Sequence, residues 1–180
     1  SKGNNTIQKD YFLPSLNLKY NLNDKNSFRL GVSKTYTLPQ AKEISPYRYV
    51  GVNFNSQGNP NLKPSDNYNL DLKWDFNPTP TELISLTAFY KLIKNPISRI
   101  EVASAGGYLS YENIADKATV AGVEIEIRKN LFVRPVSNAA HGMNKLSLGL
   151  NGSYIYTNAK MPLATVTTGS QLEGAAPWIV

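Results

Sequence analysis

The chain has 180 residues, a net charge of +6, 41% hydrophobic residues and no cysteine. This length supports one domain with a sizeable core, and the lack of cysteine excludes disulfides, thiolate metal sites and cysteine nucleophiles. The 19 Lys and Arg residues are scattered singly, whereas a nucleic-acid-binding surface concentrates them, so no nucleic-acid partner is expected. No run approaches the roughly 18 apolar residues that a membrane-spanning helix needs.

Alternation of apolar and polar residues predicts the first two strands. Side chains on a strand point alternately to its two faces, and this period of two runs through about 12–22 and again through about 28–36. A turn cluster at 23–26 joins the two predicted strands into a tight hairpin. The period then disappears from 39 to 66, and a connection of that length inside a compact domain is usually functional.

The third predicted strand, at 67–77, has the clearest two-faced pattern in the chain. A proline-containing hook at 59–64 leads into it. Its apolar parity consists of Tyr68, Leu70, Leu72, Trp74 and Phe76, and its polar parity consists of Asn67, Asn69, Asp71, Lys73 and Asp75. A short turn at 77–81 leads into a fourth strand at 82–94. Both strands therefore present one aromatic or aliphatic face and one polar face.

Two long strands follow a second irregular connection at 95–118. Short β-like pieces at 97–103 and 108–113 flank a predicted Gly-Gly hairpin turn inside this connection. A fifth strand is predicted at 119–129 and a sixth at 145–157, because apolar residues again alternate with polar ones.

The remaining segments complete the predicted chain order. An Asn-Gly pair at 151–152 is typical of a hairpin turn, although the unbroken parity favours one long strand. A connection at 130–144 precedes this strand, a third long connection at 158–176 follows it, and 178–180 begins a seventh strand. No stretch has helical periodicity over three turns, so no helix is expected.

The lengths of the strands and connections indicate a transmembrane β-barrel. The predicted strands have about ten to thirteen residues, whereas soluble strands have a mode of about five or six and tilted membrane strands need about nine to eleven. Short or medium connections alternate with long ones, which is typical of the periplasmic turns and extracellular loops of outer-membrane barrels. Charge is nearly absent from the apolar parity. Lys34 is a tolerable exception because it lies near a strand end.

Aromatic side chains near strand ends favour the same class. On the apolar parity they are Tyr36, Tyr68, Trp74, Phe76, Tyr154 and Tyr156. The interfacial girdles of a barrel lie at such positions, although aromatic residues also fill ordinary β cores. Together, the patterns predict an all-β fold: an antiparallel up-and-down meander of about six or seven long strands, forming a segment of a transmembrane β-barrel.

The hook and four other motifs resemble one family. The sequence Gly-Asn-Pro-Asn-Leu-Lys-Pro at 58–64 resembles the hook before a barrel strand in TonB-dependent outer-membrane receptors, especially those of Bacteroidetes. Further similar motifs lie at 33–39, 86–90, 121–126 and 172–180. Two residues depart from the pattern, since Ser65 and Asn69 stand where the family commonly has Glu.

The resemblance implies a location in the bacterial outer membrane and a role without catalysis or a cofactor. Residues 1–180 would form one incomplete barrel segment, since barrels of about 22 strands surround a plug, and the plug domain and TonB box are expected in other parts of a longer protein. The whole protein would import a scarce ligand (a siderophore, cofactor or glycan) and contact the TonB complex through its N-terminal region. Outer-membrane lipid is a further expected partner. Self-association of the isolated fragment is expected because an open sheet has unpaired edges.

Candidate ligand-binding residues lie in the long connections. They are Tyr47, Arg48, Tyr49, Asn53, Phe54, Asn55, Tyr108, Tyr111 and Asn113. Rigid aromatic rings offer contact area at a low cost in conformational entropy, and the amides can hydrogen-bond the rim of a sugar or a siderophore. The alternative interpretation is that these residues pack the loops against one another.

Two other classes of protein remain open at this point. A soluble β-sandwich carbohydrate-binding module would have two packed sheets with Tyr47, Tyr49 and Tyr108 on one concave surface. A β-sandwich glycosidase would use Glu124 and Glu126 as its carboxylate pair, although pairing with a base such as Arg128 or Lys91 explains them more simply. A metal site is not expected, because the single histidine, His141, has no partner at ligand spacing.

Overall fold

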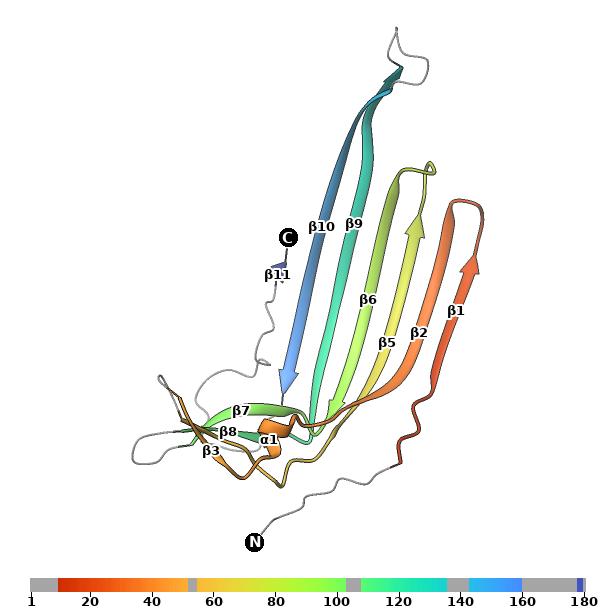
Figure 1. Cartoon of the computed structure of the whole chain (residues 1–180). Coiled ribbons are helices and arrows are strands. Elements are labelled where there is room, and N and C mark those ends of the chain that lie inside the picture. Colours follow the sequence, from red (N-terminus) through yellow and green to blue (C-terminus); the bar gives the residue numbers. More distant parts are fainter. Residues whose placement is uncertain (1–9, 52–54, 103–107, 136–142, 160–177, 180) are drawn as a thin grey trace.

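The structure is a computed structural model that describes residues 10–51, 55–102, 108–135, 143–159 and 178–179. Its main element is an antiparallel sheet of seven strands in the order β1-β2-β5-β6-β9-β10-β11. These strands are β1 (Ser15–Asn21), β2 (Asn26–Thr37), β5 (Ser65–Phe76), β6 (Leu83–Lys94), β9 (Lys117–Pro135), β10 (Met143–Ala159) and β11 (Trp178–Ile179). Figure 1 shows consecutive long strands side by side, from red β1 to blue β10. The predicted all-β meander is confirmed.

One face of this large sheet is apolar across all its long strands. Leu72 on β5 pairs with Leu30 on β2 and with Ala88 on β6. The row continues through Val123 on β9 to Tyr154 on β10. Directly paired residues share a face of the sheet, so the predicted parity holds from strand to strand. Leu72 is 51% exposed in the chain by itself.

Charged pairs mark both ends of this apolar face. Lys34 lies 3.6 Å from Asp66 at the end of the long connections, and Lys129 lies 3.2 Å from Glu82 at the end of the short turns. Leu92, in the row of Lys34, lies ten residues along the chain from Glu82. Ten residues span about 34 Å along a strand. A strand tilted by about 40° therefore crosses about 26 Å along the membrane normal. The apolar band of outer-membrane barrels is about 25 Å tall.

The girdle aromatics lie mostly where the sequence places them. Tyr68 lies in the same row as Lys34, at one end of the band. Trp74 and Phe76 stack with ring centroids 6.3 Å apart near the opposite end. Tyr154 is an exception, because it lies in the central row with Leu72 and Val123. The prediction that Tyr154 marks an interface is wrong, since β10 continues beyond it to Ala159.

The opposite face of the large sheet is polar. Arg29 and Lys73 both approach the buried carboxylate of Asp75, at 3.4 and 3.5 Å. Phe89 is an aromatic residue on this face, and it packs directly over Gly122 on β9. A Cβ atom at Gly122 would meet the Phe89 ring and lie 2.6 Å from the Tyr154 carbonyl oxygen. Glycine is therefore required for this close approach.

Strands β9 and β10 are longer than predicted. The connection predicted at 130–144 is strand at both of its ends. A β-bulge explains the error: Ser147 pairs with Asn130 and Leu146 with Phe132, which leaves Leu131 as an extra residue. An extra residue shifts the parity of the strand by one, so alternation no longer shows that the strand continues. The preference for one strand across 151–152 is confirmed, because both residues pair with β9.

A single helical turn, α1 (Ala41–Ile44), was not predicted. The backbone N–H of Gln40 donates to the Glu43 carboxylate at 2.8 Å, which closes the first turn. Four residues are too few to show a periodicity of 3.6, so the expectation of no helix was wrong here. Within the described residues, no helix has the length and apolar character needed to cross a membrane.

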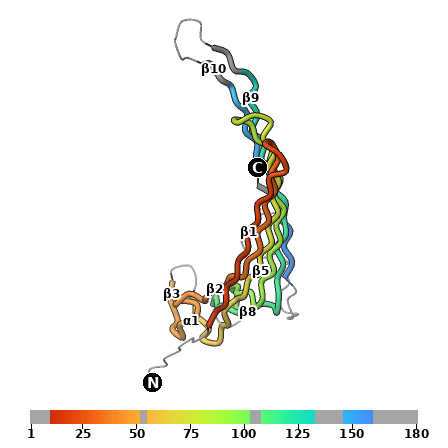
Figure 2. The backbone as a smooth tube through the Cα atoms, turned by 90° about the vertical axis from the view of Figure 1, so that its right-hand side faces the viewer, coloured from red at the N-terminus to blue at the C-terminus, as the bar shows by residue number. Residues whose placement is uncertain are grey.

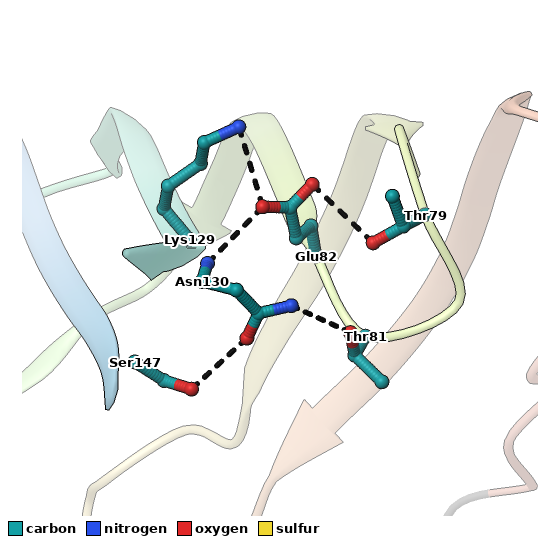
Figure 3. Close-up of polar contacts among 6 residues, drawn as sticks. All are labelled: Thr79, Thr81, Glu82, Lys129, Asn130 and Ser147. Atoms are coloured by element: carbon teal, nitrogen blue, oxygen red, sulfur yellow. Dashed lines mark hydrogen bonds and ion pairs between the residues drawn. The ribbon is translucent and has the colours of Figure 1, made fainter. Parts of the chain in front are cut away.

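Glu82 ties the turn after β5 to β9 at the short-turn end. Strand β6 stops pairing at Leu83, opposite Arg128, while β9 continues. The Glu82 carboxylate then accepts hydrogen bonds from the Asn130 backbone N–H at 3.1 Å and the Thr79 hydroxyl at 3.3 Å (Figure 3). Glu82 thus replaces the missing strand partner of β9. The Asn130 side chain extends the same network to Thr81 and Ser147.

These contacts predict a specific response to acid. The hydrogen bond from the Asn130 backbone, followed by Lys129, holds the pKa of Glu82 below its ordinary value of 4.5 against the opposing effect of burial. The stabilisation is therefore complete above about pH 4.5 and is lost as the pH falls through the lowered pKa of the folded state. We expect the melting temperature of the full-length protein in detergent to fall more steeply below pH 4.5 for wild type than for Glu82→Gln. Glu124→Gln is the matched control and should follow wild type. Equal acid responses in wild type and Glu82→Gln would contradict the assignment.

Candidate functional site

Two of the long connections fold together into a second, smaller sheet. Its strands, in the order β3-β4-β8-β7, are β3 (Arg48–Val50), β4 (Asn55–Gln57), β8 (Tyr108–Asn113) and β7 (Ile97–Val102). The two connections meet where Ser56 of β4 pairs in parallel with Leu109 of β8. Figures 1 and 2 show this small sheet at the long-connection end of the large sheet, on its concave side. The predicted β7–β8 hairpin is confirmed.

The hook before β5 holds the small sheet in place. Asn113 on β8 makes three hydrogen bonds with its side-chain amide: its oxygen accepts from the Lys63 N–H at 2.9 Å, and its nitrogen donates to the carbonyls of Lys63 at 3.0 Å and Asn95 at 2.9 Å. Asn59 adds a bond from its amide nitrogen to the Tyr111 carbonyl at 3.0 Å. We call these contacts the hook clip. They fix the small sheet to the start of β5.

Gly58 joins the hook to the helical turn. Next to it, the Asn59 N–H donates to the Glu43 carbonyl at 2.6 Å. A Cβ atom at Gly58 would lie 2.6 Å from the Lys42 carbonyl oxygen and 2.8 Å from that of Glu43, and closer still to Ser45. No larger side chain fits there without a shift of the backbone, so α1, the hook and the small sheet form one packed unit.

Three candidate residues at β3 offer side chains to solvent. Tyr47 is 74% exposed, Tyr49 is 49% exposed, and Arg48 is exposed as well. The guanidinium carbon of Arg48 lies 5.5 Å from the centre of the Tyr108 ring, a cation–π contact across β4. Such a contact orients the guanidinium while leaving its N–H donors for a ligand.

The other candidates have different surroundings. Tyr108, Tyr111 and Asn55 are half-buried, and the Asn113 amide is occupied by the hook clip. Asn53 and Phe54 lie outside the described residues. No local sequence pattern marks the hook clip, because the Asn113 side chain lies 50 residues from Lys63 along the chain.

The register separates the candidates between two faces of the small sheet. Tyr49, Ser56 and Leu109 are successive partners and share one face. Tyr108 directly precedes Leu109, so it has the opposite parity and lies on the other face, with Arg48. The expectation of Tyr47, Tyr49 and Tyr108 on one concave surface of a carbohydrate-binding sandwich is therefore not met. The seven sequential strands form one curved meander, and the small sheet lies at one end of it (Figure 1) rather than covering its face as in a sandwich.

One carboxylate of the pair on the polar face has an ordinary salt-bridge partner. Glu124 and Glu126 line a hollow of about 370 Å³ together with Lys73. Glu126 pairs with Arg128 at 2.9 Å, as the simpler interpretation predicts. No group of three His, Cys, Asp or Glu side chains suited to a metal ion occurs among the residues that the structure describes.

Comparisons with known proteins agree on one family. Residues 1–180 match the family model described as TonB dependent receptor-like, beta-barrel. The iron-regulated outer membrane virulence protein of Vibrio cholerae serotype O1 is 27% identical over 160 residues, which cover 83% of this chain and 22% of that protein. The chain thus spans about a fifth of the length of this curated relative.

Solved structures share the fold. The siderophore receptor PirA from Pseudomonas aeruginosa superposes with a TM-score of 0.60 at 24% identity, covering 82% of this chain and 25% of that receptor. The ferric enterobactin receptor PfeA superposes with a TM-score of 0.56 at 20% identity, covering 81% and 22%. The predicted location in the outer membrane is confirmed, while the Bacteroidetes subtype stays a prediction. The chain belongs to the β-barrel of the TonB-dependent receptors.

Proposed function

We propose that this chain supplies membrane strands and part of the extracellular ligand-binding surface of a receptor that imports a ferric siderophore. The observation that carries the proposal is the small sheet, which joins two long connections and at which the first of them exposes Tyr47, Arg48 and Tyr49. The structurally similar proteins PirA, a siderophore receptor, and PfeA, a ferric enterobactin receptor, support the ligand class. Energy coupling through the TonB complex, and the absence of a catalytic step, belong to the same proposal.

The exposed side chains suit the chemistry of an anionic aromatic ligand. Tyrosine rings stack on flat aromatic groups in offset or edge-to-face geometry. Arg48 adds a permanent positive charge and a planar set of donors, and the net charge of +6 favours the approach of an anion. A neutral glycan would stack on the tyrosines and accept hydrogen bonds from Arg48, but it would not use the positive charge of Arg48.

We expect the double variant Tyr47→Ala and Tyr49→Ala to weaken binding of ferric enterobactin about tenfold in the full-length receptor. Each aromatic contact is worth about 0.5–1.5 kcal/mol beyond area burial, and a factor of ten is about 1.4 kcal/mol. The measurement is equilibrium binding and uptake of radiolabelled ferric enterobactin by iron-starved cells.

Tyr20→Ala is the matched control, because Tyr20 is an exposed tyrosine (64%) on the apolar face near the short-turn end. It should bind like wild type. Wild-type uptake of a glycan or a corrinoid cofactor in place of the ferric chelate would overturn the ligand class. Unchanged binding in the double variant would remove Tyr47 and Tyr49 from the binding surface.

A further inference from the structure

Three lysines gather on the lipid-facing side of the sheet, at its extracellular end. The outermost row of paired residues on this face runs Tyr36, Asp66, Lys94 and Lys117. The next row runs Lys34, Tyr68, Leu92 and Thr119. We call Lys34, Lys94 and Lys117 the lysine cluster. The three lysines have the same parity as the apolar face, so their side chains lie on the face of the sheet that contacts the membrane.

The lysine cluster carries more positive charge than its surroundings balance. Lys94 and Lys117 are direct partners on neighbouring strands, and like charges in that arrangement repel. Asp66, 3.6 Å from Lys34, is the one carboxylate among the paired residues of these two rows. Even with Asp116, which precedes Lys117 in the chain, the ammonium groups outnumber the carboxylates.

Tyr68 gathers two of the ammonium groups at one place. The Nζ atom of Lys34 lies 5.5 Å from the centre of its ring, and that of Lys94 lies 5.3 Å from the same centre. Both amines are therefore held over one aromatic ring rather than spread through solvent. Tyrosines and lysine amines at this depth face the headgroup layer of the bilayer.

Among the described residues at the opposite end of the apolar face, the lysine nearest the membrane is balanced by a carboxylate, and Arg134, which has the same parity and pairs with Asn144, lies two rows farther out beyond the bulge. Lys129 there lies 3.2 Å from Glu82, so that one lysine meets one carboxylate. The two ends of the apolar face correspond to the two sides of the membrane, because long loops are extracellular and short turns are periplasmic in this class of barrel. The excess of positive charge therefore faces the outer leaflet.

We propose that the lysine cluster, together with Tyr68, binds the phosphate of a lipid headgroup in the outer leaflet. Lysine binds phosphate as a compact point charge with several donors. A lipid fits better than free phosphate, because the next row towards the membrane centre is Val32, Leu70 and Tyr90, whose exposed apolar surface would contact the acyl chains. The lipid would also separate the charges of Lys94 and Lys117.

The test is native mass spectrometry of the full-length receptor in neutral detergent, titrated with phosphatidylglycerol. The probe variant is Lys94→Gln with Lys117→Gln. We expect its affinity for phosphatidylglycerol to fall about 20-fold, since each lysine near an anionic lipid surface is worth roughly a factor of five. Diacylglycerol, which lacks the phosphate, should bind wild type and variant equally.

Two further variants make the result specific. Lys19→Gln with Lys25→Gln removes the same charge from the polar face and the β1–β2 turn, where both lysines line a hollow of about 590 Å³, and should bind like wild type. Lys94→Arg with Lys117→Arg keeps the charge and should retain at least half the affinity. Equal binding by wild type and the glutamine variant would overturn the proposal. Competition by millimolar inorganic phosphate that fully displaces the lipid would instead assign the cluster to free anions and overturn the lipid assignment.

Discussion

Leu72→Arg is expected to destabilise the barrel by about 2–4 kcal/mol, the cost of placing an arginine at the middle of the lipid face of a barrel. Leu72 lies in the central row of the apolar face, and its side chain is 51% exposed without lipid. In the membrane this surface contacts hydrocarbon, where the guanidinium loses its hydration. The measurement is reversible urea unfolding of the full-length receptor in lipid vesicles.

Two control variants test whether the cost depends on the depth and the face of the substituted residue, and not only on the added charge. Leu92→Arg, at the end of the apolar band beside Tyr68, should cost only about 0–1 kcal/mol. Thr87→Arg lies one residue from Ala88 but on the polar face, opposite Glu124, and should also have a small effect. If Leu72→Arg and Thr87→Arg proved equally costly, the face containing Leu72 would not be the lipid face.

The long strands could be predicted because lipid on one side and a polar lumen on the other impose an uninterrupted period of two. The expected strand at 67–77 appears as β5 and the one at 82–94 as β6, each within two residues at its ends. The period of two is lost where a bulge adds a residue or where a strand extends beyond the lipid. The extra residue Leu131 shifts the parity within β9, and the strand there runs beyond the band that imposes the pattern.

The small sheet could be predicted only in part, because its stability comes from contacts between segments far apart in the chain. The β7–β8 hairpin has local alternation, but β3 and β4 have three residues each and depend on the pairing of Ser56 with Leu109. Composition identified the aromatic and amide residues of the long connections. It could not say which side chains, such as those of Tyr47 and Tyr49, remain exposed and which, such as that of Asn113, bind the backbone.

Parity also contains a signal that Lys34 alone does not show. By itself, Lys34 is a single charge near a strand end, where the lipid face tolerates it. Counting the same parity along β6 and β9 reaches Lys94 and Lys117, which the register places in one row. The lysine cluster could have been suspected from spacing alone, but only the pairing of β6 with β9 brings these two residues together.

Asn113→Ala is expected to release the hook from β8 while leaving the large sheet folded. The substitution removes three hydrogen bonds, each worth about 0.5–1.5 kcal/mol, and leaves the Lys63 N–H without its acceptor. The Asn95 carbonyl keeps a second donor in the Ser65 hydroxyl at 2.8 Å, so we expect a local loss of about 2–3 kcal/mol. Hydrogen exchange of the full-length receptor should show the Lys63 amide exchanging roughly 30- to 150-fold faster, since every 1.4 kcal/mol is a factor of ten.

A graded pair of variants shows whether the amide itself holds the unit together. Asn113→Asp keeps the acceptor for Lys63 and loses both donated bonds, so its Lys63 exchange should lie between wild type and Asn113→Ala. Asn55→Ala changes another half-buried asparagine of the small sheet and should leave Lys63 exchange unchanged. The amides of β5 and β6 within the membrane band should stay protected in every variant, because their partners lie in the large sheet. Unchanged exchange at Lys63 in Asn113→Ala would mean that the buried hook residue Leu62, rather than the hook clip, anchors the small sheet to the large sheet.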